Sequence, residues 1–289
     1  MRFEEYFEPQ TIEECIELKN ELGDRAVFVA GGTDVVPKLK TSAIRPDAVI
    51  SLHRLKELNG ISFREGGLFI GALTTLRKLS LSDELKGGYR VIAEAAGHVS
   101  SLQIRNTATI GGNACNASPS ADAVQGLMVL DAVCLIKGME GMSEIPIADF
   151  FTGPGKTALK NGELLTGFFV PEPQGFTEAA YVKYSIRGDT DISIVGAAAA
   201  ISRGDDTAAK KVRISLAAVA PVPLRVFPAE DFLTGKVISE NDIDEASDIA
   251  KDFCSPIDDQ RATAGYRKEM VKVQTRIALE QVSKALPEV

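Results

Sequence analysis

The sequence of 289 residues contains no tryptophan and only two histidines, His53 and His98. With so few imidazoles, the chain has little from which to build a Ser-His-Asp triad or a histidine-rich metal site. Its four cysteines stand far apart and form no CxxC pair, which argues against a zinc ribbon, an iron–sulfur site or a disulfide scaffold within this chain. If the protein is an enzyme, a bound cofactor is therefore expected to carry the chemistry.

Positive charge is outnumbered by negative charge, with 32 Lys and Arg against 40 Asp and Glu and a formal net charge of −8. An acidic chain repels phosphate backbones, so general nucleic-acid binding is disfavoured, although a local pocket for one small anion remains compatible with this charge. No uncharged apolar run approaches the roughly 18 residues that a membrane helix requires. The acidic N-terminus lacks the apolar segment of a secretory signal, and we expect a cytoplasmic protein.

The balance of 45% hydrophobic and 25% charged residues is typical of a soluble globular protein, and the length favours about two domains. A Pro/Gly-rich break at Pro171–Gly175 separates two patterns. Before it, we expect helices and strands in alternation: helices at Ile12–Leu22, Gly88–Gly97 and Asp122–Leu130, strands at Ala26–Ala30, Ala48–Leu52 and Ala132–Lys137, and a hairpin at Ile61–Ile70. After it, we expect strands at Ala180–Ile186, Ile192–Ile201 and Lys211–Val219, then helices at Ala229–Leu233, Ile243–Phe253 and Arg261–Leu286. The whole is predicted to be α+β.

The first candidate binding segment is the run Ala30-Gly31-Gly32-Thr33-Asp34-Val35, which follows a buried strand. Glycines permit positive φ and let the backbone approach a ligand closely, and successive amides in such a turn form an anion site. The segment is neither GxGxxG nor a Walker A loop. A plain strand-to-helix turn explains it equally well when it is taken alone.

The second candidate segment runs from Gln103 to Asp122 and includes Thr109-Ile110-Gly111-Gly112-Asn113. We interpret it as a long loop in which Ser118 caps the next helix, with Asp122 in the first turn of that helix. Asp122 either serves only its helix or accepts hydrogen bonds from ligand hydroxyls, such as those of a ribose; the length of the loop favours the second interpretation. Two diglycine segments could grip one diphosphate from both sides with backbone donors, which fits a dinucleotide such as FAD.

At these residues the chain resembles the FAD-binding (medium) subunit of the molybdenum hydroxylase family, the group of xanthine dehydrogenase, carbon monoxide dehydrogenase and 4-hydroxybenzoyl-CoA reductase. The resemblance rests on the two diglycine segments, on Gln103–Asn106 and on Ala117–Asp122. It continues through Lys183–Val195, Val219–Arg225 and Asp258–Arg267. It covers nearly the whole chain, in order. It implies the FAD-binding fold of the vanillyl-alcohol oxidase type over residues 1–174, with two subdomains divided near 55–60. A smaller α+β domain with a three-stranded antiparallel sheet and helices is implied over residues 175–289.

The resemblance also implies non-covalent FAD and a set of cofactor contacts, with no catalytic residue or metal ligand on this chain. The contacts implied are Ala30, Gly31, Gly32, Thr33, Asp34, Val35, Thr109, Ile110, Gly111, Gly112, Asn113, Ser118, Asp122, Leu165 and Lys183. A contact at Val99 occurs in some relatives with a bulkier residue. Lys183 is either an exposed strand cation or a charge that steadies the reduced flavin.

By the same resemblance, the chain is expected to be the electron-transfer subunit of a heterotrimer. Electrons would pass from a molybdopterin-binding large subunit through 2Fe–2S clusters of a small subunit to FAD, and then to an acceptor such as NAD or a quinone. Two alternatives stay open: a non-catalytic flavin-binding module, and a stand-alone FAD-dependent oxidoreductase with its own substrate pocket.

Overall fold

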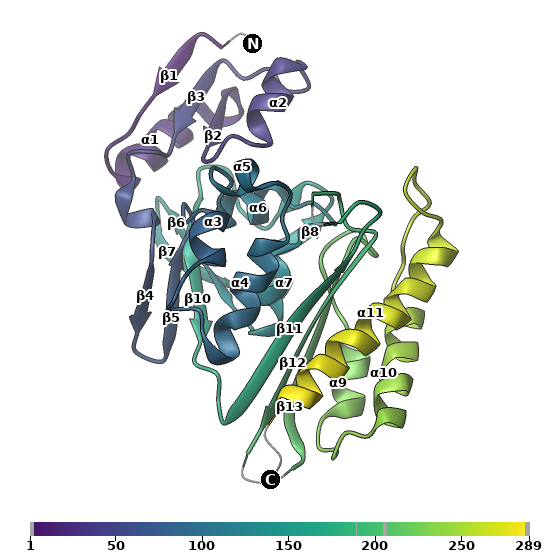
Figure 1. Cartoon of the computed structure of the whole chain (residues 1–289). Coiled ribbons are helices and arrows are strands. Elements are labelled where there is room, and N and C mark those ends of the chain that lie inside the picture. The colour runs from purple at the N-terminus through teal and green to yellow at the C-terminus, as the bar shows by residue number, and fades with distance from the viewer. Residues whose placement is uncertain (1–2, 189, 205–206, 287–289) are drawn as a thin grey trace.

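The computed structural model describes residues 3–188, 190–204 and 207–286. Its main sheets follow one another along the chain, and we name the parts around them the N-terminal lobe (3–58), the central lobe (59–174) and the C-terminal lobe (175–286) (Figure 1). Helices and strands mix in all three lobes, which confirms the predicted α+β class. None of the helices in the described residues is both long and apolar enough to cross a membrane.

The N-terminal lobe is a parallel three-stranded sheet in the order β1–β3–β2. Its central strand is buried along its whole length, as expected for a strand with neighbours on both edges. Thr11 caps α1 by accepting a hydrogen bond from the amide of Glu14, and Gly23 ends the helix at φ +54°. The elements are β1 (Glu5–Phe7), α1 (Ile12–Leu22), η1 (Gly23–Arg25), β2 (Ala26–Val29), α2 (Val35–Lys40), β3 (Ala48–Ser51) and η2 (Lys56–Leu58).

The central lobe is an antiparallel sheet in the order β4–β5–β10–β6–β7, covered by short helices. Its core contains the fully buried Leu68, Ile70 and Phe168 of the sheet, with Val91 and Ile92 of α4. The strands are β4 (Ile61–Arg64), β5 (Gly67–Gly71), β6 (Val133–Gly138), β7 (Gly141–Pro146) and β10 (Leu164–Pro171), with a small pair β8 (Phe151–Gly153) and β9 (Lys156–Thr157). The helices are α3 (Leu76–Ser80), η3 (Gly87–Tyr89), α4 (Arg90–Gly97), α5 (Leu102–Arg105), α6 (Ile110–Asn116), α7 (Ala123–Val129) and α8 (Ile147–Phe150).

The C-terminal lobe is an antiparallel sheet in the order β11–β12–β13–β14, flanked by three helices. The prediction had three strands; a fourth, β14, pairs with β13 and is two residues long, too short to give a periodic pattern. The strands are β11 (Phe176–Tyr184), β12 (Val195–Arg203), β13 (Ala209–Ala217) and β14 (Leu224–Arg225). The helices are α9 (Phe227–Leu233), α10 (Glu240–Phe253) and α11 (Ala264–Ala285).

Small residues in β12 allow the C-terminal sheet to be buried on both faces. Ala197 and Ala199 belong to the core formed with α9–α11, whereas Ala198 and Ala200 belong to the core of the central lobe. A strand buried on both faces needs no polar alternation, which explains the unbroken alanine run. The central and C-terminal lobes thereby share apolar packing across β12, and Figure 1 shows the long strands of this sheet beside α4 and α7 of the central lobe.

Candidate functional site

A cleft of about 630 Å³ lies between the N-terminal and central lobes. Both diglycine segments line it, as the sequence predicted. They also touch each other, because a Cβ added to Gly31 would lie 2.0 Å from the carbonyl oxygen of Thr107. Gly31 is therefore required for close packing of one segment against the lead-in to the other.

The first segment connects β2 to α2 and leaves its backbone donors open. Gly32 has φ +71°, a conformation that a residue with a side chain rarely adopts. In the part of the chain that the structure describes, the amides of residues 31–34 donate to no acceptor. A run of open amides in such a turn is a ready site for an anion.

The second segment is helical, which corrects the predicted long loop. Thr109 is the N-cap of α6, and its hydroxyl oxygen accepts a hydrogen bond from the Gly112 amide at 3.0 Å. The amides of Ile110, Gly111 and Asn113 donate to Thr74, Ala72 and Thr109 carbonyls, respectively. The segment therefore offers side-chain donors to a ligand, and the expectation that both segments supply free backbone amides is wrong for this one. A Cβ on Gly111 would lie 2.6 Å from that of Ala72, so this glycine serves the packing of α6.

The predicted cap at Ser118 is also wrong. Helix α7 begins at Ala123 and Asp122 holds its N-cap position without a capping hydrogen bond from its side chain. The Ser118 hydroxyl instead lies 3.1 Å from the hydroxyl of Ser120, and both serines line the cleft. The Ser118 hydroxyl oxygen also accepts a hydrogen bond from the Ser120 amide at 3.3 Å, so it serves the turn before α7 and not the helix itself.

Asp122 is buried in a network that joins the central lobe to the C-terminal lobe. Its carboxylate accepts hydrogen bonds from the Tyr181 hydroxyl at 2.6 Å, from the Lys183 ammonium at 2.9 Å and from Ser193. Lys183 also donates to the carbonyl of His98 at 2.8 Å. A buried charge has to be paired in this way, because an unpaired one would be costly.

Three of the predicted contacts do not line the cleft: Ile110, Asp122 and Lys183. Ile110 points into the core and is fully buried. Asp122 directly follows Ala121, which lines the cleft, and Lys183 pairs with Asp122. The direct cofactor contacts predicted for all three residues stay predictions.

The remaining predicted residues do line the cleft: Ala30, Gly31, Gly32, Thr33, Asp34, Val35, Thr109, Gly111, Gly112, Asn113, Ser118 and Leu165, with Val99 beside them. Apolar side chains, among them Phe28, Leu76 and Ile104, line further parts of the same cleft. One cleft thus combines polar donors with apolar surface, as small-molecule sites usually do.

Sequence reasoning missed Lys19, Lys38, Asn116 and Ile192, all of which line the cleft. The Lys19 ammonium donates to the carbonyls of Gly23 and Ala26, both at 2.7 Å, and burial lowers its pKa. Ile192 comes from the C-terminal lobe, so only the tertiary structure brings it to the cleft. Lys38 follows the first diglycine segment by about one helical turn, and this spacing alone does not mark a lysine as a ligand contact.

The residues present fit FAD. Such a ligand has a charged diphosphate and an apolar ring, and the cleft offers open amides at residues 31–34 together with apolar side chains. The side-chain oxygen of Asn113 is buried in the described structure without a hydrogen-bond partner, and Asn113 lines the cleft. An orphaned buried acceptor of this kind is usually satisfied by a ligand or an ordered water. The volume also lies within the roughly 300–1,000 Å³ of typical ligand pockets.

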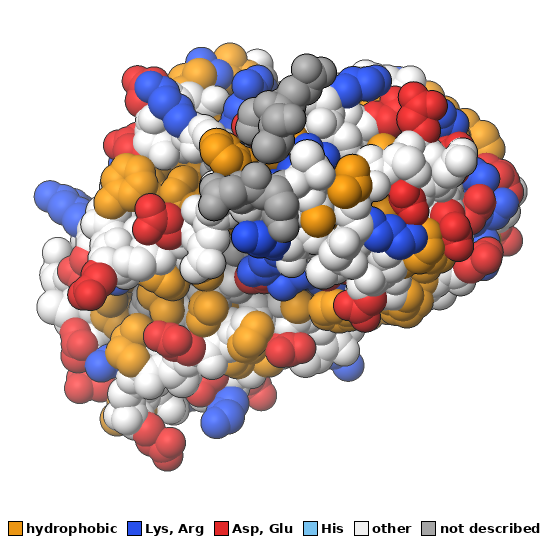
Figure 2. Space-filling model, turned by 90° about the horizontal axis from the view of Figure 1, so that it is seen from below, with side chains coloured by type: hydrophobic (Ala, Val, Ile, Leu, Met, Phe, Trp, Pro, Cys, Tyr) orange, Lys and Arg blue, Asp and Glu red, His pale blue; other side chains and the backbone are white. Residues whose placement is uncertain are grey.

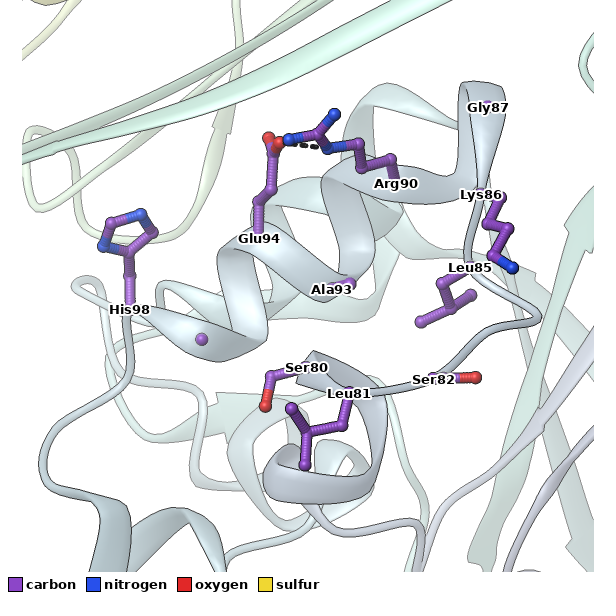
Figure 3. A pocket seen from close by; sticks show the side chains of 11 residues that line it. Ser80, Leu81, Ser82, Leu85, Lys86, Gly87, Arg90, Ala93, Glu94 and His98 are labelled. Atoms are coloured by element: carbon purple, nitrogen blue, oxygen red, sulfur yellow. Dashed lines mark ion pairs between the residues drawn. The ribbon is translucent and has the colours of Figure 1, made fainter.

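Two other hollows lie away from the diglycine segments. One, of about 770 Å³, is an open groove between the end of α3 and α4, where Arg90 and Glu94 form an ion pair at 2.9 Å (Figure 3). The other, of about 710 Å³, is lined by basic residues of β12 and β13, and Lys and Arg side chains gather in the middle of the lower face of the molecule (Figure 2). Neither contains a diglycine segment, so the interlobe cleft is the candidate site.

Comparison with known families supports the assignment of this cleft as a FAD site. Residues 1–173 match the FAD binding domain in molybdopterin dehydrogenase, and residues 180–282 match the CO dehydrogenase flavoprotein C-terminal domain. The matched class is an FAD-binding oxidoreductase flavoprotein. The chain belongs to the FAD-binding medium subunits of the molybdenum hydroxylase family, which confirms the resemblance seen in the sequence.

Individual relatives are similar over almost their full lengths. The xanthine dehydrogenase FAD-binding subunit of Escherichia coli is 31% identical over 281 residues, which cover 96% of each chain. The carbon monoxide dehydrogenase medium chain of Afipia carboxidovorans is 32% identical over 278 residues, again 96% of each chain. Among solved structures, a carbon monoxide dehydrogenase chain from Hydrogenophaga pseudoflava aligns with a TM-score of 0.95 at 30% identity, covering 99% of both chains.

Proposed function

We propose that the chain holds FAD in the interlobe cleft and passes electrons through it within a molybdenum hydroxylase complex. Electrons leave the substrate on a molybdopterin-binding large subunit and travel through 2Fe–2S clusters of a small subunit to the flavin. They then pass to an external acceptor such as NAD or a quinone. The relatives support this assignment, because they are named as FAD-binding subunits or medium chains of dehydrogenases.

The single observation that carries the proposal is the meeting of the two diglycine segments in one cleft. The open amides of residues 31–34 would hold the diphosphate from the side of the N-terminal lobe. From the central lobe, Thr109, Asn113 and Ser118 would add side-chain hydrogen-bonding groups. We assign the diphosphate to this asymmetric pair of surfaces, with amides on one side and side chains on the other.

The flavin, when bound, supplies the redox chemistry, so the chain needs no acid–base pair of its own. Leu165 and the apolar side chains of the cleft would bind its ring and exclude water. Asp122 and Lys183 would hold the C-terminal lobe against the cleft wall, which keeps Ile192 in place at the cleft. We propose the direct contacts of Ile110, Asp122 and Lys183 with FAD as a further part of this assignment.

Two broader assignments belong to the same proposal. We divide the chain at residue 174 into a FAD-binding domain and a C-terminal domain, with the first domain split near 55–60; the separate sheets support this division.

We also place the complex in the cytoplasm. All four cysteines are unpaired, as is usual for a reducing compartment.

The test is to purify the full chain, both alone and with any subunits that copurify, and to measure flavin, molybdenum and iron. We expect FAD at about one per chain, non-covalently bound, with absorbance that bleaches on reduction. Molybdenum and iron should be recovered with the copurified subunits. Purification of folded chain that takes up no FAD at all would contradict the proposal, whereas FAD without molybdenum-containing partners would contradict only the assembly.

A further inference from the structure

Lys38 on α2 has a contact pattern unlike that of the other lysine in the cleft. The two cations that line the cleft among the described residues are Lys19 and Lys38. The Lys19 ammonium is engaged by two backbone carbonyls. The Lys38 ammonium donates to the side-chain oxygen of Asn116 at 2.9 Å, so its printed side-chain partner is a neutral amide and its donors are not all taken up by protein carbonyls.

This contact belongs to a bridge between the lobes. Asn116, at the end of α6, donates through its side-chain nitrogen to the carboxylate of Asp34 at 3.1 Å. Lys38 and Asp34 belong to the N-terminal lobe and Asn116 to the central lobe, and all three line the cleft. The bridge therefore connects the two walls between which the diphosphate is proposed to lie.

The charges at this bridge need a cation once a diphosphate is present. Asp34 places a carboxylate next to the open amides of the first segment. A diphosphate adds two negative charges there, and like charges a few Å apart repel each other even at this solvent-exposed position, although salt screens the repulsion. Lys38 is positioned to offset this repulsion, and its flexible stem and three donors suit a phosphate as well as they suit Asn116.

From these contacts we propose that Lys38 is a binding residue for the FAD diphosphate and that Asn116 tethers it across the cleft. The proposal rests on FAD binding as proposed above, and adds a side-chain cation to a site otherwise made of amides and hydroxyls. The cation is needed because the Asp34 carboxylate repels the diphosphate. Lys38 thus tunes affinity for the phosphate-bearing part of the cofactor, not the redox chemistry.

The experiment measures the Kd of FAD for the full chain stripped of flavin, by titration calorimetry. Lys38→Met should raise the Kd about tenfold, as expected for the loss of one charge-assisted hydrogen bond. Lys38→Arg should stay within about threefold of the unaltered chain. The matched control is Lys40→Met, a change of the same kind on the same helix at an exposed lysine that does not line the cleft; it should bind FAD as the unaltered chain does.

Two further measurements separate a charge effect from a structural one. In about 1 M salt, where charges are screened beyond roughly 3 Å, the difference between Lys38→Met and Lys40→Met should shrink. Adding Asp34→Asn to Lys38→Met should restore part of the lost affinity, because it removes the repulsive carboxylate. Equal Kd values for Lys38→Met and Lys40→Met at low salt would overturn the proposal, and so would a loss that salt leaves unchanged. Failure of the unaltered, folded chain to bind FAD would instead overturn the proposed function.

Discussion

Asp131, just after α7, forms ion pairs between the central lobe and the C-terminal lobe. Removing its charge should lower the free energy of unfolding. Its carboxylate pairs with Lys211 at 2.6 Å and with Arg225 at 2.8 Å, and a third contact, to Arg213, is 2.9 Å long. Arg225 also forms a buried, bidentate pair with Glu230. We choose Asp131→Asn, because φ at this position is +51° and asparagine tolerates that conformation as aspartate does.

The size of the effect follows from the pKa of Asp131. Burial by itself would raise the pKa, but hydrogen bonds from Lys211 and Arg225 and the charges of Arg225 and Arg213 outweigh it and lower the pKa from 3.8 to about 2. Each tenfold change in proton affinity is worth about 1.4 kcal/mol, so the lowered pKa corresponds to about 2.5 kcal/mol, which solvent screening of this partly exposed carboxylate reduces to about 2 kcal/mol. Asp131→Asn should therefore lower the free energy of unfolding by about 2–3 kcal/mol at pH 7, the excess coming from the arginines left undercompensated.

The pH dependence has a definite sign. Because the folded-state pKa lies below the unfolded one, the stabilisation is complete well above pH 3.8 and is lost as the pH falls towards 2. At pH 3 about half of it should remain. Urea unfolding of the unaltered chain and of Asp131→Asn at pH 7 and pH 3 measures both effects. The control is Asp83→Asn, whose carboxylate forms an exposed pair with Lys86 and should matter by less than about 0.5 kcal/mol.

Either of two results would contradict a charge-based role for Asp131. One is a loss at pH 7 no larger than that of Asp83→Asn. The other is a loss of equal size at pH 3 and pH 7, which would mean that the asparagine acts through packing or backbone strain rather than through the missing charge.

Three further changes test the cleft, the buried network and the core. Gly31→Ala, whose methyl group would overlap the Thr107 carbonyl, should destabilise the chain by about 1–3 kcal/mol and weaken FAD binding, as urea unfolding and flavin titration will measure; unchanged values for both would show that the two segments do not pack as described. Tyr181→Phe removes a hydrogen bond to the buried Asp122 and should cost about 1–2 kcal/mol in thermal or urea unfolding, and a stabilised variant would contradict this. Phe168→Ala, in the fully buried centre of the main sheet, should cost about 3–5 kcal/mol, and a loss below about 1 kcal/mol would count against this core assignment.

Much of the fold could be predicted because its signals are local. The cap at Thr11, the buried run at Ala48–Ser51 and the strand–turn–strand pattern around Gly66 all act within a few residues of chain. Helix α6 escaped prediction for a local reason as well. Its paired glycines are poor helix formers, and only the Thr109 cap and tertiary packing against Ala72 make up for them.

From the sequence alone, scarce histidine indicated a bound cofactor, the two diglycine segments indicated a dinucleotide, and the order of motifs identified the family. Only the tertiary structure decided which backbone amides stay open, because pairing with Ala72 and Thr74 closes those of the second segment. It also decided the partners of Asp122 and Lys38, which lie between 59 and 78 residues away along the chain. Caps and periodicity depend on neighbours within a turn of helix or strand, whereas these contacts exist only after distant segments have packed together.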